Sequence, residues 1–182
     1  MQLVTERLVL REFASEDWEA VLRYQSDPLY LRYTPREERT EADARSLVSM
    51  FLRWREELPR YRYQVAIALR ENGQLIGNCG IRGSASKSWE AELGYEIDSR
   101  YWGQGYASEA ARAIVDFGFR ELRLHRIWAH CIADNTGSAR VMQKLGMRFE
   151  GRLYETEWMR ERWWDLLLYA LLDREWQPSH TN

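Results

Sequence analysis

The chain of 182 residues carries a formal net charge of −2 at pH 7, and this length suits one domain with its own core. Acidic and basic residues are interleaved without a broad basic region, which argues against nucleic acid as a partner. The longest apolar run near the C-terminus, residues 166–172, is far shorter than the ~20 residues of a membrane-spanning helix. We therefore expect neither nucleic acid nor membrane as a partner.

Targeting signals and metal-ligand patterns are also missing from the sequence. Residues 1–7 contain no apolar region of the kind found in signal peptides. Cys79 and Cys131 lack CxxC spacing and lie in apolar stretches, so we expect small core residues rather than a disulfide. His125 and His130 have no partner at metal-ligand spacing, so no metal is expected. These features favour a cytoplasmic protein.

The first half of the chain predicts a strand followed by two helices. Alternating apolar residues indicate a strand from Leu3 to Phe13. A helix capped by Ser15 should follow. A second helix should begin at the capping-box pair Thr40 and Asp43. Residues 29–39, between the helices, are expected to form an ordered loop.

A hairpin is predicted next, with strands at residues 63–69 and 75–81. Asn72-Gly73 between them favours a type I′ turn. The following strand, residues 89–97, should place Ala91, Leu93, Tyr95 and Ile97 on one face and Glu90, Glu92, Gly94 and Glu96 on the other. Because glycine inside a strand often marks a bulge, a bulge at Gly94 is expected to splay this strand from the next one, at residues 126–133.

The run Arg100-Tyr101-Trp102-Gly103-Gln104-Gly105-Tyr106-Ala107 lies between this strand and an amphipathic helix. Its two glycines allow the backbone to approach a ligand closely, and the first N–H groups of the helix have no intrahelical acceptor. Such a junction can bind phosphate. A dinucleotide fingerprint is disfavoured because Ser108 stands where a third glycine is needed, and a P-loop is excluded because no GK[ST] follows.

The remaining elements complete a mixed α/β sheet. After the strand at residues 126–133, a short helix should begin near Asn135 and stop at Gly146. Two further strands are predicted at residues 148–158 and 163–172. The helix that starts near Ala107 crosses between two strands, which suits a parallel pair, whereas consecutive strands suit antiparallel pairing.

With these elements in order, the chain resembles the GNAT N-acetyltransferase superfamily, in particular its RimJ/RimL-like branch. Thr5-Glu6-Arg7-Leu8-Val9-Leu10-Arg11 looks like the opening strand of that branch. Arg100-x-x-Gly103-x-Gly105 is similar to the acetyl-CoA pyrophosphate loop. Asn135-x-x-Ser138, followed by Lys144-Leu145-Gly146-Met147, resembles the final helix motif.

The resemblance implies a GNAT-like acyl-CoA N-acyltransferase fold, with a mostly antiparallel mixed sheet, a splayed central strand pair and flanking helices. Residues 1–176 would form a single N-acetyltransferase domain and residues 177–182 a short tail. Acetyl-CoA would be the co-substrate, without a metal. Its pyrophosphate would bind the backbone N–H groups of Gly103, Gln104, Gly105, Tyr106 and Ala107. Its pantetheine arm would contact the backbone of Tyr95 and Ile97, together with Asn135 and Ser138.

The resemblance also implies catalytic roles. Glu92 matches the strand carboxylate of the family and is the candidate general base. A base is most needed for alkylamines, of which only ~0.1% is neutral at pH 7. Met142 stands where many relatives have a tyrosine that protonates the leaving thiolate. Ser138 is therefore the candidate acid, with Tyr95 and Tyr106 in reserve. A solvated carboxylate at Glu92 and ordinary helix capping by Asn135 and Ser138 are the alternatives.

A protein N-terminal amine is the acceptor that the branch suggests, and acetyl transfer by direct attack is expected because neither cysteine has a base nearby in sequence. Small amines, polyamines, amino acids and aminoglycosides are alternative acceptors. A catalytically idle CoA-binding sensor or a nucleotide-binding regulator are alternative functions. Two aromatic sets could wall the acceptor site, or serve the core or a homodimer instead: Trp158, Trp163, Trp164, Trp176, Tyr154 and Tyr169 on one side, and Tyr30, Tyr33 and Trp54 on the other.

Overall fold

The computed structural model describes residues 1–177. Thirteen helices and strands are present in this range, besides three short 3-10 turns: β1 (Gln2–Val4), β2 (Leu8–Glu12), α1 (Trp18–Gln25), α2 (Pro28–Leu31), α3 (Glu41–Arg55), β3 (Arg62–Leu69), β4 (Leu75–Ser84), β5 (Lys87–Ile97), α4 (Tyr106–Arg120), β6 (Arg126–Ile132), α5 (Thr136–Lys144), β7 (Arg148–Met159) and β8 (Arg162–Leu172). The tail predicted from Gln177 lies, beyond that residue, outside the described range.

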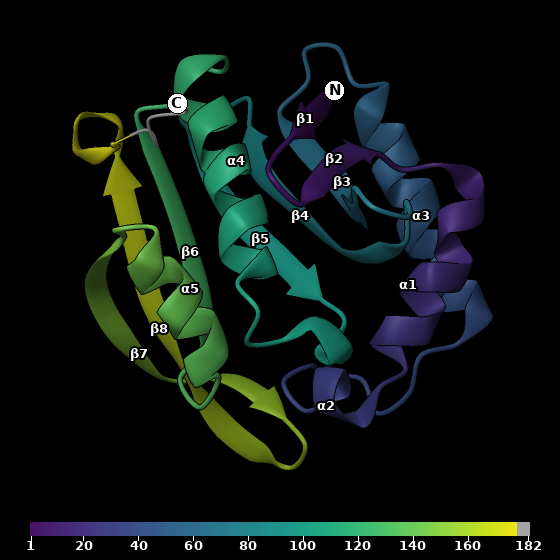
Figure 1. Cartoon of the computed structure of the whole chain (residues 1–182). Coiled ribbons are helices and arrows are strands. Elements are labelled where there is room, and N and C mark those ends of the chain that lie inside the picture. Colours follow the sequence, from purple (N-terminus) through teal and green to yellow (C-terminus); the bar gives the residue numbers. More distant parts are fainter. Residues whose placement is uncertain (178–182) are drawn as a thin grey trace.

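All eight strands form one sheet in the order β1-β2-β3-β4-β5-β6-β8-β7 (Figure 1). Every neighbouring pair is antiparallel except β5 and β6, which are parallel and connected through α4. The predicted mixed, mostly antiparallel sheet is therefore confirmed. The connection through α4 supplies the crossover that a parallel pair requires.

The alternation of β3 explains why both faces of the sheet are covered. Val65 and Ile67 belong to the main core cluster, which includes the buried face of α4. Ala66, on the other face of β3, packs in a second cluster with residues of α1 and α3. The sheet is thus buried on both sides at its centre, and the stripe predicted on α4 faces it: Ala110, Ala111, Ile114, Val115, Gly118 and Phe119 are buried.

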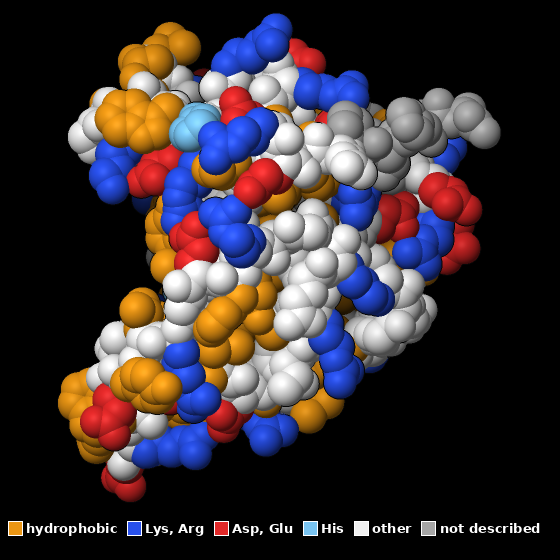
Figure 2. Space-filling view, turned by 90° about the vertical axis from the view of Figure 1, so that its left-hand side faces the viewer, with side chains coloured by type: hydrophobic (Ala, Val, Ile, Leu, Met, Phe, Trp, Pro, Cys, Tyr) orange, Lys and Arg blue, Asp and Glu red, His pale blue; other side chains and the backbone are white. Residues whose placement is uncertain are grey.

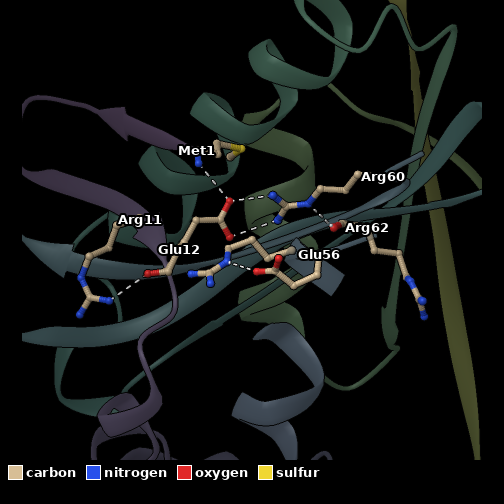
Figure 3. Close-up of polar contacts among 7 residues, drawn as sticks. Met1, Arg11, Glu12, Glu56, Arg60 and Arg62 are labelled. Atoms are coloured by element: carbon tan, nitrogen blue, oxygen red, sulfur yellow. Dashed lines mark hydrogen bonds and ion pairs between the residues drawn. The ribbon is translucent and has the colours of Figure 1, made fainter. Parts of the chain in front are cut away.

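The N-terminal segment differs from the prediction, because the single expected strand is a tight hairpin of β1 and β2. The chain reverses at Thr5–Arg7, where the Thr5 N–H donates to the Leu8 carbonyl at 2.9 Å. Figure 3 shows the other end of β2, where the Glu12 carboxylate contacts the Met1 amine and the Arg60 guanidinium. Burial alone raises the pKa of Glu12, but these cationic donors hold it below its usual value.

Two hairpin turns have conformations that differ from what their residue types indicate. At Asn72-Gly73 only the glycine has a positive φ, of 72°, so the turn is not type I′. A four-residue loop is formed instead, in which the Gly73 N–H donates to the Leu69 carbonyl at 2.8 Å. The turn between β7 and β8 has positive φ at both Arg160 and Glu161, 53° and 56°, as type I′ requires, without a glycine.

Local predictions in the helical region are partly corrected. The capping box of Thr40 and Asp43 is present at the start of α3. Ser15 caps no helix, because it lies inside a 3-10 turn and its hydroxyl contacts Glu16. The loop expected at residues 29–39 is wrong for its first three residues, because residues 29–31 belong to the short helix α2, whose first turn is capped by the Asp27 side chain.

The central strand pair is splayed as predicted, but without a bulge. The parallel pairing of β5 with β6 extends only over Glu90–Glu92 and Arg126–Trp128, and the two strands diverge beyond it (Figure 1). The register between β4 and β5 is regular through Gly94. The Arg82 guanidinium crosses Gly94 from β4 and occupies the space that a Cβ at position 94 would take, so a larger residue there would displace this side chain.

The outer strand β7 is exposed along nearly its whole length. Large hydrophobic side chains are exposed on it and on the start of β8: Phe149, Leu153, Tyr154, Trp158 and Trp163. Figure 2, which faces the β7–β8 side, shows hydrophobic side chains gathered among charged ones at the lower end of this surface. Among residues 1–177, no helix is long and apolar enough to cross a membrane.

Candidate active site

The junction before α4 presents a row of free backbone amides. Gly103 and Gly105 have φ of 75° and 88°, so both use the left-handed region that glycine allows. Within residues 1–177, no acceptor takes a hydrogen bond from the N–H groups of residues 103–107. These amides and the positive end of a 15-residue helix form a site for an anion.

The loop is held in place from the N-terminal hairpin. Arg7 donates through Nη1 to the Gln104 carbonyl at 3.0 Å, and its guanidinium lies 4.2 Å from the centre of the Tyr106 ring. Glu109, in the first turn of α4, accepts from the Thr5 hydroxyl at 2.6 Å and from Arg7 Nε at 2.7 Å. Partial burial alone raises the pKa of Glu109, but these hydrogen bonds hold it below its usual value.

Because β5 and β6 diverge, some backbone N–H groups of β5 have no neighbouring strand to bond with. The Asp98 N–H, just after β5, donates to the Ile76 carbonyl in β4, whereas the Trp89 carbonyl accepts from the N–H of His125, the residue before β6. Because backbone groups alternate in direction along a strand, the N–H groups of Tyr95 and Ile97 face the β6 side. The strand β6 has diverged at that point, so both amides lie on an open edge.

The side chain of Tyr95 bridges the split to α5. Its hydroxyl donates to the Ser138 carbonyl and contacts the Ser138 hydroxyl, both at 2.9 Å. Burial raises the pKa of Tyr95, so the phenol keeps its proton. Asn135 caps α5 by accepting from the Ser138 N–H at 3.1 Å, and Met142 is fully buried in the core. The hydroxyl groups beside the open edge therefore come from Tyr95 and Ser138.

On the opposite face of β5, the side chains of Glu92, Arg82 and His130 meet where the strands begin to diverge. Glu92 lies 3.2 Å from Arg82 Nη2 and 3.5 Å from His130 Nδ1. Glu92 and His130 are partly exposed, and the His130 ring stacks on Trp128. The sequence predicted Glu92 here but gave no role to Arg82 or His130, because their proximity depends on strand register.

Residues of the helical region and of the β7–β8 hairpin meet beside this face. The Tyr33 hydroxyl donates to the Asp134 carbonyl at 3.1 Å, and its ring packs edge-on against Trp164. Arg160 Nη2 donates to the Leu31 carbonyl at 2.8 Å. Tyr33, from the helical region, and Trp164, from β8, are thus in direct contact, and their role as walls of the acceptor site stays a prediction. Trp54 lies elsewhere, because it packs against Phe51 in the α1–α3 cluster.

A separate cavity of about 410 Å³ lies at the other end of α4. Its lining includes Tyr61, Trp89 and Leu122, and it is distant along α4 from the free amides. We place the candidate site at the amide row and the open strand edge, where donors lack partners. Within residues 1–177, no group of three His, Cys, Asp or Glu side chains is arranged to hold a metal ion.

Comparison with known proteins agrees with this geometry. The acetyltransferase (GNAT) domain family matches residues 7–148. The uncharacterized N-acetyltransferase YnaD of Bacillus subtilis (strain 168) is 38% identical over 176 residues, which cover 97% of this chain and 99% of YnaD. The chain therefore belongs to the GNAT acetyltransferase family. It is an acetyl-CoA-dependent N-acetyltransferase.

Solved structures show the same fold. The crystal structure of a GNAT-family acetyltransferase from Bacillus anthracis is similar with a TM-score of 0.84 at 36% identity, over 96% of this chain and 100% of that one. RimL, a ribosomal alpha-N-protein acetyltransferase solved with coenzyme A, has a TM-score of 0.80 at 20% identity, over 93% and 96% of the two chains. The Rim-type resemblance seen in the sequence thus extends to the fold.

Proposed function

We propose that this enzyme transfers acetyl from acetyl-CoA to a primary amine by direct attack, and that the amine is the N-terminus of a protein. The observation that carries the cofactor part is the row of free amides at residues 103–107 next to the open edge of β5. Pyrophosphate at the amides and pantetheine along Tyr95 and Ile97 would bring the thioester into the split. An amide on that edge would stabilise the oxyanion of the tetrahedral intermediate.

The proton transfers are assigned to two groups on opposite faces of β5. Glu92 accepts the proton of the attacking amine, directly or through a water molecule. The Ser138 hydroxyl, hydrogen-bonded to Tyr95, donates to the sulfur as the C–S bond breaks. Burial raises the pKa of the Cys131 thiol to about 11 and that of Cys79 to about 12. Neither thiol is readily ionised, which favours direct attack over an acetyl-cysteine intermediate.

The exposed hydrophobic side chains near the β7–β8 hairpin favour a protein acceptor over a small amine. Trp158 and Trp163 pack against each other at a ring separation of 5.2 Å while both stay exposed. Exposed apolar patches mark protein-binding surfaces, and this hairpin also contacts the helical side of the site through Arg160. The proposal includes a cytoplasmic location, which the two free cysteines favour.

Release of free thiol from acetyl-CoA tests the proposal. The panel contains peptides beginning with serine or alanine, spermidine and free amino acids, each measured against the rate in buffer alone. We expect a peptide to be acetylated fastest, with the acetyl group on its N-terminal nitrogen by mass spectrometry. Faster acetylation of spermidine would favour a polyamine enzyme, and CoA binding without thiol release would favour a sensor. A dimer in light scattering would assign the exposed β7 surface to self-association instead.

A further inference from the structure

The three glutamates on the Glu92 face of β5 differ in their charge partners. Glu90 lies 3.0 Å from Lys87 Nζ, and Glu92 lies 3.2 Å from Arg82 Nη2. Within residues 1–177, no Lys, Arg or His nitrogen lies within 4.0 Å of the Glu96 carboxylate, although this side chain is partly buried. A carboxylate withdrawn from water without a cation is costly unless other groups hold it.

Neutral donors hold one oxygen of Glu96. Its Oε2 atom accepts from the Gln25 amide at 2.7 Å, the Asn78 amide at 2.9 Å and the Tyr24 hydroxyl at 3.2 Å. Burial, and next the neighbouring Glu96 charge, raise the pKa of Tyr24 well above its usual range, so this phenol stays a donor. The donors come from α1 and β4, and they fix the orientation of the carboxylate.

The donors are themselves held in place by further hydrogen bonds. The side-chain oxygen of Gln25 accepts from Arg39 Nε at 2.6 Å. The side-chain oxygen of Asn78 accepts from the side-chain amide of Gln64 at 2.6 Å. Gln25 is 0% and Asn78 3% exposed. A polar network this well buried, with its amides engaged at both ends, keeps Oε2 in one position.

The second oxygen, Oε1, accepts none of these three hydrogen bonds. It is not among the buried polar atoms without partners in residues 1–177, so solvent reaches it. The Tyr30 hydroxyl also lies against the Glu96 carboxylate, and like the other three groups it is neutral. Glu96 lies four residues beyond Glu92 on the same face, about 13 Å along the strand. The thioester expected beside Tyr95 would lie between the two carboxylates.

We infer that Glu96 binds the ammonium group of the acceptor through Oε1 and thereby selects acceptors that carry a positive charge. This inference rests on the proposed function, because it assigns the amine side of the same site. The three neutral donors orient the carboxylate without cancelling its charge. The negative charge therefore remains for an incoming cation. Because Glu92 lies about 13 Å away along the strand, the amine leaves Glu96 before Glu92, which is paired with Arg82, takes its proton directly or through water.

Glu96→Gln tests this role, with Glu90→Gln as the matched control on the same strand face. Glutamine retains an oxygen for the three donors but loses the negative charge. We expect the KM of Glu96→Gln for the peptide amine to rise about tenfold or more, with CoA affinity and thermal midpoint unchanged. Glu90→Gln should match the wild type. A peptide whose terminal amine is replaced by hydroxyl should inhibit the wild type and Glu96→Gln equally.

Two results would overturn the inference. One is an unchanged KM for the amine in Glu96→Gln. The other is an equal loss of affinity for the amine, its hydroxyl analogue and CoA, which would show that Glu96 only supports the fold. Failure of the proposed function gives a different result, since the wild type would then bind CoA but acetylate no amine of the panel.

Discussion

The two sides of β5 are built in different ways. On the cofactor side, the free amides of residues 103–107 come from one continuous segment, and their function depends on backbone conformation. On the acceptor side, Glu92 and Glu96 meet side chains from strands β4 and β6 and from helix α1. The cofactor side can therefore be altered through a single residue, whereas the acceptor side depends on long-range register.

This difference suits the chemistry of the two ligands. The cofactor is always the same, and backbone amides bind its diphosphate without requiring any particular side chain. The acceptor varies among related enzymes, and side chains contributed by several elements can change one at a time. Each prediction below perturbs one side and measures whether the other side responds.

Gly105→Asp should have the largest effect. The left-handed φ of 88° and the added carboxylate at the anion site both oppose cofactor binding. We expect CoA affinity to fall more than 100-fold in calorimetry. Gly73→Asp is the matched control, because its φ of 72° imposes similar strain in a remote turn where a Cβ meets no atom within 4 Å.

The control separates strain from binding. Gly73→Asp should lower the thermal midpoint to a similar degree and leave CoA affinity unchanged. Should Gly105→Asp still bind CoA at wild-type affinity, the amide row would not be the pyrophosphate site.

Glu92→Gln perturbs the acceptor side. Removal of a general base typically costs 10²- to 10⁴-fold, so kcat should fall about 100-fold with CoA affinity unchanged. The loss should shrink at high pH, where more of the amine is already neutral. Rates measured from pH 7 to pH 9.5 check this. An unaltered kcat would assign the base role elsewhere, with the His130 imidazole, 3.5 Å from Glu92, as the next candidate.

The sequence predicted the backbone geometry of the loop before α4 because that geometry is local. Gly103 and Gly105 are adjacent to the helix they open, and the stripe of α4 follows from helical periodicity. The splayed strand pair was also foreseen, but for the wrong reason. Gly94 is a place where Arg82 crosses the strand, and nothing near it in the sequence indicates that crossing.

The acceptor side could not be predicted in the same way. His130 was dismissed as a metal ligand, and its approach to Glu92 follows only from the parallel pairing of β5 with β6. The donors to Glu96 lie 18 to 72 residues away in sequence. The residue types at the turns predicted the wrong hairpin. The type I′ turn lies at Arg160-Glu161 and not at the expected Asn72-Gly73.

Ser138→Ala tests the hydroxyl pair that links the two sides across the split. If Ser138 donates to the departing sulfur, kcat should fall about tenfold with little change in KM for the amine. Tyr95→Phe should give a similar loss, and the double variant should lose little more, because the two hydroxyls are 2.9 Å apart and act together. Additive losses would show that each hydroxyl acts independently.

Glu109→Gln should have the smallest effect and shows how firmly the amide row is held. It weakens the contacts to Thr5 and Arg7 and so loosens the grip of Arg7 on the Gln104 carbonyl. We expect a three- to tenfold loss of CoA affinity and a loss of about 1 kcal/mol in unfolding free energy at pH 7. Glu41→Gln, in an exposed pair with Arg45, should change neither quantity measurably.

The stability loss should depend on pH in a defined direction. Because the pKa of Glu109 is lowered in the folded state, its stabilisation is fully present above the ordinary carboxyl pKa of 4.5 and disappears as the pH falls through the lower folded value. Urea unfolding midpoints of the wild type and Glu109→Gln should therefore differ at pH 7 and converge below pH 4.5. Convergence without any change in CoA affinity would mean that Glu109 joins the hairpin to α4 but does not position the amides.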